Sequence, residues 1–563
     1  MDKYDVLQLF LYLSALLALS YPLGKYLASA LEDKSGLQRR LFGAAEKFIY
    51  RVCGINPDEQ MGWRRYAAAL LWFNLLGLAA VFAFQLLQRA LPFDPNGAGP
   101  VNPALAFNTA VSFMTNTNWQ AYAGEPALSY LTQMAGLGVQ NFLSAATGIA
   151  VLAALTRGLA ARRTQGLGNF WADITRITLR VLLPFSLLAA FILVGQGVVQ
   201  TFVPDKIVST VEGERQVIPL GPVASQVAIK QLGSNGGGFF NANSAHPLEN
   251  PTPLSNFLEM LLLLLLPAAC VHAYGVMVGD KRQSRLLFAV MLSLWAAGLA
   301  LSVYSEYYSA PAALGAELME GKETRFGVMN SLIWSVSTTC ASNGSVNAMQ
   351  SSLSPLAGGM ALFNIMLGEV IFGGVGTGMY GMLLFVLLTV FLCGVMVGRT
   401  PEYLGKKIEK REIQMAMAGI LAPGAVILAG AALSCALPSA LVSLSAKGPH
   451  GLTELLYAWS SASDNNGSAF AGINADTTFY NVGLGIAMLI GRFAVILPCL
   501  AIAGSMTSKQ TCPPSAGTLP TDTPTFGVLL SAVILIVGGL TFFPALALGP
   551  LAEHLLMLKG VFF

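Results

Sequence analysis

Long apolar runs, separated by shorter polar segments, form the main pattern along this chain. Ten of the runs are long enough to supply the ~20 residues with which a helix crosses the hydrocarbon core of a bilayer. They cover residues 6–30, 66–90, 128–155, 177–203, 253–278, 286–309, 356–397, 414–440, 478–506 and 525–548. The pattern predicts an all-α polytopic membrane protein with about ten transmembrane helices.

The seventh run is too long for a single crossing. It is interrupted by the sequence FGGVGTGMYG, residues 372–381, in which every second or third residue is glycine. We therefore expect the helix of this run to be broken at that stretch.

Four of the segments between spans share a second pattern. Each has a semi-apolar stretch too short to span, then a small polar cluster, then a full span. The four read AFNTAVSFMTNTNWQAYAGE, ASQVAIKQLGSNGGGFFNANS, NSLIWSVSTTCASNGSVNAM and LLYAWSSASDNNGSAFAGIN. Within them, Asn116, Asn235, Asn343 and Asn466 recur at spacings of 119, 108 and 123 residues. Similar units at a nearly fixed period indicate an internal repeat.

Each repeat is predicted to contain a span, a re-entrant half-helix, a polar loop and a second span. All four face the same way, so they can surround one axis along the membrane normal, unlike the inverted repeats of many secondary transporters. The expected architecture is a pore with pseudo-fourfold symmetry. Its predicted parts are an N-terminal helix with a basic loop (1–65), repeat 1 (66–155), repeat 2 (177–278), repeat 3 with the broken helix (286–397), repeat 4 (413–506) and a C-terminal helix (524–563).

The charges give this picture an orientation. Only 11% of the residues are charged and 54% are hydrophobic. Because basic loops stay in the cytoplasm, we expect a multi-pass membrane protein with both termini on the outer side. The net charge of +3 does not indicate nucleic-acid binding, because the basic residues lie in short loops. Of the 32 Lys and Arg residues, 21 lie in segments 31–65, 156–180, 280–285, 399–411 and 505–523, and six lie in 91–127, 204–252, 310–355 and 441–477.

The polar clusters have the chemistry of a cation site. A half-helix that enters from outside and ends in a polar loop points its partly negative C-terminus at the pore centre. Glycine permits positive φ, so consecutive carbonyl oxygens can turn toward one axis. A ring of such oxygens can replace the hydration shell of a monovalent cation. Further oxygens are expected from the hydroxyl groups of Thr117, Ser234, Ser342 and Ser345.

Asp464 is the only acid within the four clusters, which argues against a divalent-cation site built from carboxylates. The alternative interpretation is that the clusters are ordinary outward loops rich in turn-forming residues. One loop alone would favour that alternative. Four loops in register, each before a span, favour the pore.

Six stretches of the chain carry a resemblance to a known family. They read VSFMTNTNWQAYAGE, LGSNGGGFFNANSAHPLENPTPLSNF, EVIFGGVGTGMYGMLLFVLL, GRTPEYLGKKIEKRE, SSASDNNGSAFAG and GRFAVILPCLAIAGS. These stretches resemble the KdpA family, the potassium-binding subunits of bacterial Kdp potassium-transporting ATPases, and the resemblance covers nearly the whole chain. It implies a fold similar to that of the superfamily of K+ transporters built from four span–pore-loop–span units.

The resemblance also implies a function. Such a chain selects K+ in an outward-facing filter and passes it to a P-type ATPase subunit, KdpB, in a complex completed by the single-span KdpC and often the small KdpF. Gln120 matches a family position that affects potassium affinity, and we expect it to support the filter together with Gly237. The implied filter residues are Asn116, Thr117, Asn118, Ser234, Asn235, Gly236, Ser342, Asn343, Gly344, Asn465, Asn466 and Gly467.

Arg492 lies inside the ninth predicted span. An unpaired arginine at that depth is costly, so it should face a partner, for which Glu369 is the candidate, or a wet cavity. The alternative is a structural ion pair with no role in transport. We hypothesise that Arg492 and a gating loop under the filter keep K+ from running straight to the cytoplasm and divert it sideways. By resemblance, the gating loop contains Gly373, Gly374, Gly376, Thr377 and Gly378.

The chain has no means of hydrolysing ATP. It lacks a glycine-rich P-loop and a DKTG-type phosphorylation sequence, and the longest expected cytoplasmic loop, 31–65, is too short for a nucleotide domain. We therefore expect a non-catalytic subunit that takes K+ as its substrate ion, binds no nucleotide and depends on a partner chain for uphill transport.

A stand-alone K+ channel or ion-coupled K+ transporter of the same four-repeat architecture is the alternative. It would carry passive or ion-coupled flux without an ATPase partner. A membrane-embedded enzyme would need clustered His, Asp or Glu within the spans, and these spans have no such cluster.

Overall fold

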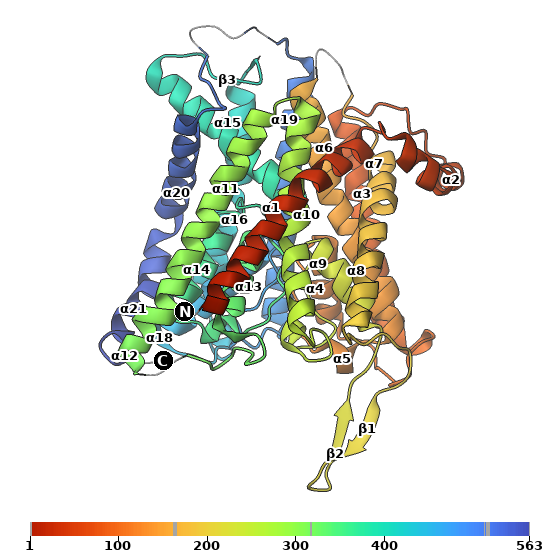
Figure 1. Ribbon diagram of the computed structural model, residues 1–563, viewed down its shortest axis with the longest axis vertical. Helices are drawn as coiled ribbons and strands as arrows, with labels where there is room; N and C mark the ends of the chain where they lie inside the picture. The colour runs from red at the N-terminus through yellow and green to blue at the C-terminus, as the bar shows by residue number, and fades with distance from the viewer. Residues whose placement is uncertain (1–2, 162–165, 316–317, 512, 514–517, 562–563) are drawn as a thin grey trace.

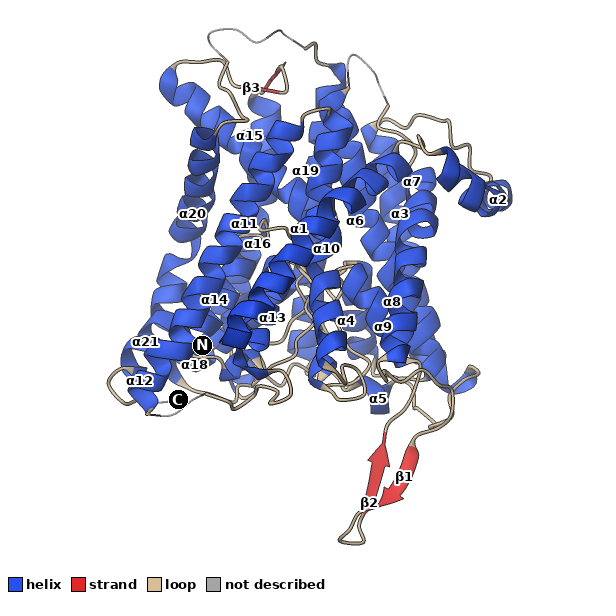
Figure 2. Ribbon diagram, in the orientation of Figure 1, coloured by secondary structure: helices blue, strands red, loops and turns tan. Residues whose placement is uncertain are grey.

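The computed structural model describes residues 3–161, 166–315, 318–511, 513 and 518–561, and helices dominate it (Figures 1 and 2). Within these ranges, ten helical segments are long and apolar enough to cross a membrane, as predicted, although several ends differ from the predicted ones. They are α1 (Lys3–Leu31), α3 (Trp63–Leu87) with η1 (Gln88–Ala90), η2 (Thr132–Gly138) with α6 (Val139–Ala160), α7 (Phe170–Ile177) with η3 (Thr178–Leu182) and α8 (Leu183–Gly195), α10 (Pro253–Val278), α11 (Lys281–Tyr304) with η5 (Ser305–Ser309) and α12 (Ala310–Leu314), α15 (Thr377–Val397), α16 (Lys410–Ala436), α19 (Thr478–Ser508), and α20 (Pro524–Leu546) with η7 (Ala547–Leu551) and α21 (Ala552–Met557).

Four of these spans form an inner ring. The segments that contain α6, α10, α15 and α19 are the most buried of the ten, and each is the second span of one predicted repeat. Helix α6 contacts α10, α10 contacts α15, α15 contacts α19, and α19 contacts α6. The inner helices therefore close around one axis, which the other spans surround.

Four shorter helices lie between the spans of the repeats. They have 10 to 16 residues, or about 15–24 Å at 1.5 Å per residue, and so fall short of a hydrocarbon core about 30 Å thick. Their side chains are largely buried. These are the predicted re-entrant half-helices: α4 (Pro103–Met114), α9 (Val223–Leu232), α13 (Gly327–Cys340) and α18 (Gly448–Ser463).

The seventh predicted span is broken as expected, but the break lies five residues earlier than the predicted stretch 372–381. Helix α14 (Pro355–Met366) ends before the glycine-rich stretch, and α15 already begins at Thr377. The break at 367–376 contains several residues with positive φ, from Gly368 (φ 77°) to Gly376 (φ 81°), a conformation that no right-handed helix accommodates. Thr377 and Gly378 therefore lie in the first turn of α15 and not in the loop.

The two ends of the molecule differ in character (Figure 1). One end holds both ends of the described chain and the antiparallel hairpin of β1 (Lys206–Ser209) and β2 (Arg215–Ile218). The other end holds α2 (Gly36–Cys53) and the hairpin of β3 (Glu402–Tyr403) and β4 (Lys406–Lys407), in the segments where basic residues are concentrated. Short helical turns elsewhere are α5 (Gly124–Ala127), η4 (Asn243–Ala245), η6 (Gln350–Ser352) and α17 (Pro438–Leu441).

Lys406 joins two inner helices at the basic end. Its Nζ donates to the carbonyl oxygen of Gly158 near the end of α6 (2.9 Å) and to that of Met506 near the end of α19 (2.7 Å). The last carbonyls of a helix lack partners within the helix, and their partly negative end favours a cation. One buried lysine therefore satisfies two helix ends and fixes repeats 1 and 4 relative to each other.

Candidate cation filter

The four half-helices end at four residue triplets that share one backbone pattern. We call 116–118, 234–236, 342–344 and 465–467 the first to fourth triplets. In every triplet the first and third residues have positive φ and the middle residue does not. Positive φ at the first and third residues allows successive carbonyl oxygens of a triplet to turn toward one axis. The positive φ values are those of Asn116 (68°), Asn118 (56°), Ser234 (47°), Gly236 (71°), Ser342 (52°), Gly344 (81°), Asn465 (59°) and Gly467 (88°).

The pattern corrects the register inferred from the recurring asparagines. Asn116 is the first residue of its triplet, whereas Asn235, Asn343 and Asn466 are middle residues. Asn116 therefore corresponds to Ser234, and the spacing of 119 residues between Asn116 and Asn235 is one too long. The error arose because asparagine both adopts positive φ and supplies amide hydrogen bonds, so its recurrence does not identify one structural position.

Hydrogen bonds join neighbouring triplets. The first triplet contacts the second where Asn116 Nδ2 donates to the carbonyl oxygen of Ser234 (2.8 Å). The third contacts the fourth where Ser342 Oγ donates to the carbonyl oxygen of Asn465 (2.8 Å), and the fourth returns to the first where Asn465 Nδ2 donates to Thr117 Oγ1 (3.0 Å). The four triplets, which lie hundreds of residues apart in the sequence, therefore form one assembly.

The third residue of a triplet explains the glycines and completes the ring. A Cβ atom built on Gly236 would overlap the carbonyl oxygen of Asn343, the middle residue of the next triplet. In the same way, a Cβ atom built on Gly344 would overlap the carbonyl oxygen of Asn466, and one built on Gly467 would overlap the carbonyl oxygen of Thr117. Glycine is required at these positions by the close approach of two backbones as well as by positive φ.

The first triplet breaks this rule, because its third residue is Asn118. The neighbouring loop compensates with a second glycine: a Cβ atom built on Gly237 would lie 3.4 Å from the Cβ atom of Asn118. Both polar atoms of the Asn118 side chain are buried and lack a hydrogen-bond partner among the described residues. Its amide is thus available to a ligand in the ring, and one quarter of the ring differs chemically from the other three.

The expected hydroxyl groups all take part in hydrogen bonds within the protein. Thr117 Oγ1 accepts from Asn465, Ser234 Oγ donates to the carbonyl oxygen of Leu263 (3.3 Å), and Ser345 Oγ donates to Gln231 Oε1 (3.0 Å). These side chains, with Ser342, hold the loops to their surroundings. Backbone carbonyls are the oxygens that all four triplets can offer in the same way.

Gln120 supports the second triplet from the first loop. Its Oε1 accepts from the backbone N–H of Gly238 (2.8 Å) and its Nε2 donates to the carbonyl oxygen of the same residue (3.1 Å). Gly237, which precedes this residue, has a φ of 71°. The side-chain amide of Gln120 thus makes the two hydrogen bonds that a neighbouring strand would make. It fixes the backbone at Gly238, where the chain leaves the filter.

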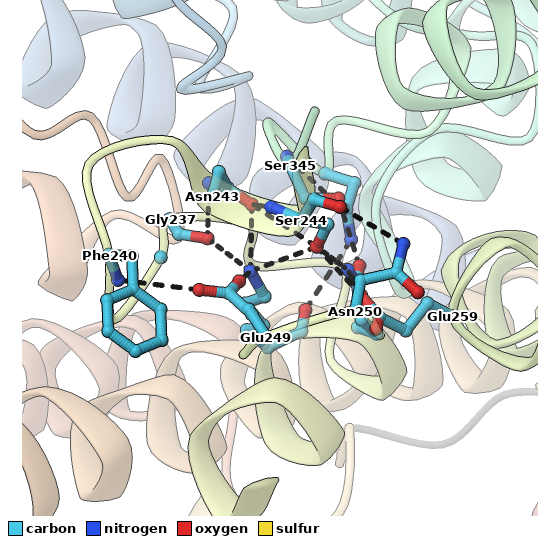
Figure 3. Close-up of polar contacts among 12 residues, drawn as sticks. Gly237, Phe240, Asn243, Ser244, Glu249, Asn250, Glu259 and Ser345 are labelled. Carbon is cyan, nitrogen blue, oxygen red and sulfur yellow. Dashed lines mark hydrogen bonds and ion pairs between the residues drawn. The ribbon is translucent and has the colours of Figure 1, made fainter. Parts of the chain in front are cut away.

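A buried lysine that sequence reasoning missed holds the other side of the same loop. Figure 3 shows Gly237, Asn243 and Glu249, the residues that this lysine contacts. Lys230 Nζ donates to the carbonyl oxygen of Gly237 (2.8 Å) and to Asn243 Oδ1 (2.8 Å), and it forms an ion pair with Glu249. The side chains of Lys230 and Glu249 are 1% and 0% exposed. The sequence reading treated Lys230 only as a charge of an outward segment. The signal that could have identified it is its position four residues before Ser234, within a predicted half-helix, where a charged side chain is expected to be buried and to have a partner.

The network continues to the third triplet through Gln231. Its Oε1 accepts from Ser345, which follows the third triplet, and its Nε2 donates to Glu259 Oε2 (3.0 Å). Ser244 Oγ donates to the same carboxylate oxygen (2.7 Å). Adjacent quarters of the ring are thereby joined behind the backbone, on the side away from the axis.

The predicted ion pair between Arg492 and Glu369 is wrong. Arg492 Nη2 donates to the carbonyl oxygen of Ser144 (3.3 Å), and Glu369 Oε1 accepts from Asn466 Nδ2 (2.6 Å). Each side chain is almost fully buried. Arg492 is thus satisfied by a carbonyl of α6, and Glu369 separately by a filter asparagine.

Arg492 and Glu369 do share a cavity, as the wet-cavity alternative required. The cavity has a volume of about 50 Å³ and is also lined by Asp464 and by the filter residues Ser342 and Asn465. A second cavity, of about 70 Å³, shares Asp464 with the first and extends between α15, α16 and α20. The two cavities are therefore neighbours.

The broken segment between α14 and α15 lies next to this cavity. A Cβ atom built on Gly374 would lie 3.3 Å from Ser342 Cβ, and one on Gly376 would overlap the carbonyl oxygen of Gly148 in α6. The N–H of Gly373 donates to the carbonyl oxygen of Cys340 at the end of α13 (2.9 Å). The segment is thus wedged between a half-helix end and an inner helix, and Gly378 belongs to the helix that follows.

Comparison with known proteins places the chain among ion-transport proteins. The sequence profile described as "KdpA: Potassium-transporting ATPase A subunit" matches residues 10–555. The potassium-transporting ATPase potassium-binding subunit of Rhodospirillum centenum is 56% identical over 100% of this chain and 99% of the relative, and that of Sorangium cellulosum is 54% identical over 99% and 100%. Among solved structures, the potassium transporter TrkH from Vibrio parahaemolyticus matches with a TM-score of 0.53 at 14% identity, covering 88% of this chain and 98% of that one. This last likeness confirms the predicted fold class.

Proposed function

This chain belongs to the potassium-transporting ATPase A subunit family, and we propose that it is the subunit that selects K+ and passes it on in an ATP-driven uptake pump. The observation that carries the proposal is the ring of four triplets with alternating φ. Rings of backbone carbonyls can replace the hydration shell of K+. Because the potassium-binding subunit is not the catalytic one, hydrolysis of ATP falls to a partner chain.

In this proposal K+ is the substrate ion and is bound by the carbonyl oxygens of the four triplets. The positive φ at the first and third positions supports this role, because it aligns the carbonyls of each triplet. Asn118 adds a side-chain oxygen in one quarter, since its amide has no protein partner among the described residues. Gln120, Gly237 and Lys230 act as positioning residues, because each fixes the loop of the second triplet.

Below the filter, we assign the diversion of K+ to Arg492 and the broken segment between α14 and α15. An ion that leaves the ring enters the cavity that Arg492, Glu369 and Asp464 line. The guanidinium of Arg492 repels the cation, so we assign its exit to the neighbouring cavity between α15, α16 and α20. Support comes from the residues that line both cavities, among them Gly368, Asp464 and Val495.

The partners follow from the family. We propose that the ATPase subunit KdpB receives the ion, with KdpC and the small KdpF completing a complex in the bacterial inner membrane. The end of the molecule with α2 and the β3–β4 hairpin is assigned to the cytoplasm, because basic loops gather there and such loops remain on the cytoplasmic side. Both termini then lie in the periplasm.

A stand-alone channel or ion-coupled transporter is not favoured by the family membership. The test is K+-stimulated ATPase activity of the complex that co-purifies with this chain. Gly236→Asp, which forces a carboxylate against the carbonyl of Asn343, should abolish stimulation at low K+ concentration. Gly213→Asp serves as the control, because Gly213 also has positive φ but lies in an open turn. Passive flux through the purified chain alone, or K+ stimulation that Gly236→Asp leaves intact, would overturn the proposal.

A further inference from the structure

Helix α2 exposes a large apolar surface that the filter and its partners do not use. Leu37, Leu41, Phe48 and Val52 have exposed fractions between 65% and 68%. Their spacing of 4, 7 and 4 residues places them on one narrow face of a helix with 3.6 residues per turn. A soluble helix would bury such a face against a core, so this face requires a covering.

Basic side chains border the apolar face. Arg40, Lys47 and Arg51 are all exposed, and at 100° per residue they follow one another along a single edge of the apolar stripe. No acidic residue of α2 lies on that edge, because the helix contains one acid, Glu46, which is buried on the opposite side. The outward side of α2 thus combines a hydrophobic stripe with a row of positive charges.

The opposite face is firmly attached to the bundle, so the outward face has a fixed direction. Arg180 of η3 forms two hydrogen bonds with Glu46, from Nε (2.5 Å) and Nη2 (2.7 Å). Gln38 Nε2 donates to the carbonyl oxygen of Tyr26 in α1 (3.3 Å). Helix α2 is therefore fixed in position by residues of two spans.

The position of α2 indicates what covers it. It connects the end of α1 at Leu31 to the start of α3 at Trp63, so it lies at the level where two spans end. It extends sideways from the bundle next to α7 and away from α20 (Figure 1). A helix at this level whose outer face is apolar with a basic edge has the chemistry of an interfacial helix.

We propose that α2 binds the surface of a bilayer that contains anionic phospholipid. Leu37, Leu41 and Phe48 enter the boundary between headgroups and acyl chains, and Arg40, Lys47 and Arg51 meet the lipid phosphates. Apolar burial holds such a helix on any bilayer, and the basic edge adds about 1 kcal/mol per residue on an anionic surface, or about fivefold in affinity. This interaction goes beyond the proposed transport function and does not depend on it.

A cavity beneath the last turn of α2 has matching chemistry. It has a volume of about 500 Å³ between α2, α3 and α7, with Ile49, Phe73 and Trp171 among its lining residues. The exposed Arg65 also lines it and forms an ion pair with Glu59. The cavity thus brings apolar side chains and an arginine together next to the proposed lipid-binding helix.

The first test compares lipids retained by the purified full-length chain. Protein from vesicles of mixed phosphatidylcholine and phosphatidylglycerol is analysed by native mass spectrometry. Replacing Arg40, Lys47 and Arg51 by Gln should reduce the preference for phosphatidylglycerol, by about fivefold for each residue that contacts the surface. The control replaces Lys281, Arg282 and Arg285 by Gln, which removes the same charge from another basic segment at the same end. Equal lipid preference in the two triple variants would overturn the proposal.

The second test identifies what covers the apolar face. A photo-reactive phenylalanine analogue at position 48 is activated in native membranes with the whole complex present. Adducts with phospholipid support the proposal, whereas adducts with another protein chain would overturn it. K+ binding measured on the same preparations separates failure of this inference from failure of the proposed filter, because α2 lies outside the filter.

Discussion

The side-chain amide of Gln120 and the backbone of Gly238 form a pair of hydrogen bonds, one in each direction. Gln120 belongs to the loop of the first triplet and Gly238 follows the second triplet, so the pair fixes two quarters of the ring relative to each other. A side chain that never needs to touch the ion can in this way determine where the carbonyls stand.

Removing this pair should weaken K+ binding without slowing the pump at saturation. Gln120→Leu loses both hydrogen bonds, each worth about 1 kcal/mol, and we expect the K+ concentration for half-maximal ATPase activity to rise about tenfold while the maximal rate stays unchanged. Gln120→Glu keeps the acceptor for the N–H of Gly238 but faces its carbonyl with a carboxylate, and should be impaired as well. An unchanged half-maximal concentration in the Leu variant would refute the positioning role.

Gly344→Ala should damage the filter more than its backbone strain alone explains. An alanine at positive φ costs about 1–2 kcal/mol wherever it occurs, and here its Cβ atom would also overlap the carbonyl oxygen of Asn466. We expect K+ affinity, measured by isothermal titration, to fall at least about tenfold, which corresponds to about 1.4 kcal/mol. Gly213→Ala, with the same strain and open space around it, should bind K+ like the wild type. Equal effects of the two substitutions would mean that the ring contact is unimportant.

Removing Lys230 and Glu249 together should restore stability that is lost when Lys230 alone is replaced, but should not restore K+ affinity. Lys230→Met leaves Glu249 buried without its cation, which costs about 3–5 kcal/mol, so we expect a strongly lowered melting temperature. The double variant Lys230→Met with Glu249→Gln should recover most of that loss. Its K+ affinity should stay weakened, however, because the carbonyl of Gly237 still lacks its ammonium donor. Recovery of both properties together would indicate a purely structural pair.

Arg492→Ala should allow K+ to leak through the chain. A positive charge beside the path raises the barrier for a cation by about 1–2 kcal/mol at an effective dielectric constant of about 20. We therefore expect passive rubidium flux into vesicles to increase about tenfold and ATP-coupled uptake to fall. Arg492→Lys keeps the charge and serves as the control. The gating hypothesis is wrong if Arg492→Ala leaves flux, K+ affinity and coupled uptake unchanged.

The contact between α18 and α21 should depend on pH. Burial lowers the pKa of His450, but its hydrogen bond to Glu553 (2.9 Å) and the charge of that carboxylate outweigh burial and raise the pKa above its ordinary value. Protonated His450 therefore stabilises the fold fully below the unfolded pKa of about 6.5, and this contribution is lost as the pH rises through the folded pKa. The melting temperature of the wild type should therefore fall as the pH rises from about 6.5 through the folded pKa, and that of His450→Gln should fall less. Parallel pH profiles would contradict the assignment.

The spans and the four triplets could be predicted from the sequence because hydropathy and repetition are local signals. Apolar length identifies a span, and the clusters around Asn116, Asn235, Asn343 and Asn466 recur at almost constant distances. The asparagine spacing alone placed the first triplet one residue out of register, because asparagine and serine both accept positive φ at the first position. The filter residues implied by the resemblance already had the register that the backbone shows.

Contacts between distant segments were beyond the reach of sequence reasoning. Lys230 looked like a loop charge because its partner Glu249 and its acceptor Gly237 become neighbours only when the loop folds back. Glu369 looked like a partner for Arg492 because both are charged residues at membrane depth. The structure instead pairs Glu369 with Asn466, since a hydrogen bond from an amide also satisfies a buried carboxylate.

The ring contacts have a consequence for biosynthesis. Residues 465–467 are among the last parts of the site to leave the ribosome, and the N-terminal parts of a chain generally fold first. Until the fourth triplet arrives, Thr117 lacks the glycine that packs against its carbonyl and the hydrogen bond from Asn465. A truncated or half-made chain thus has three quarters of a filter and no closed one. The closed ring that is proposed to recognise the ion therefore forms only once the fourth repeat is in place.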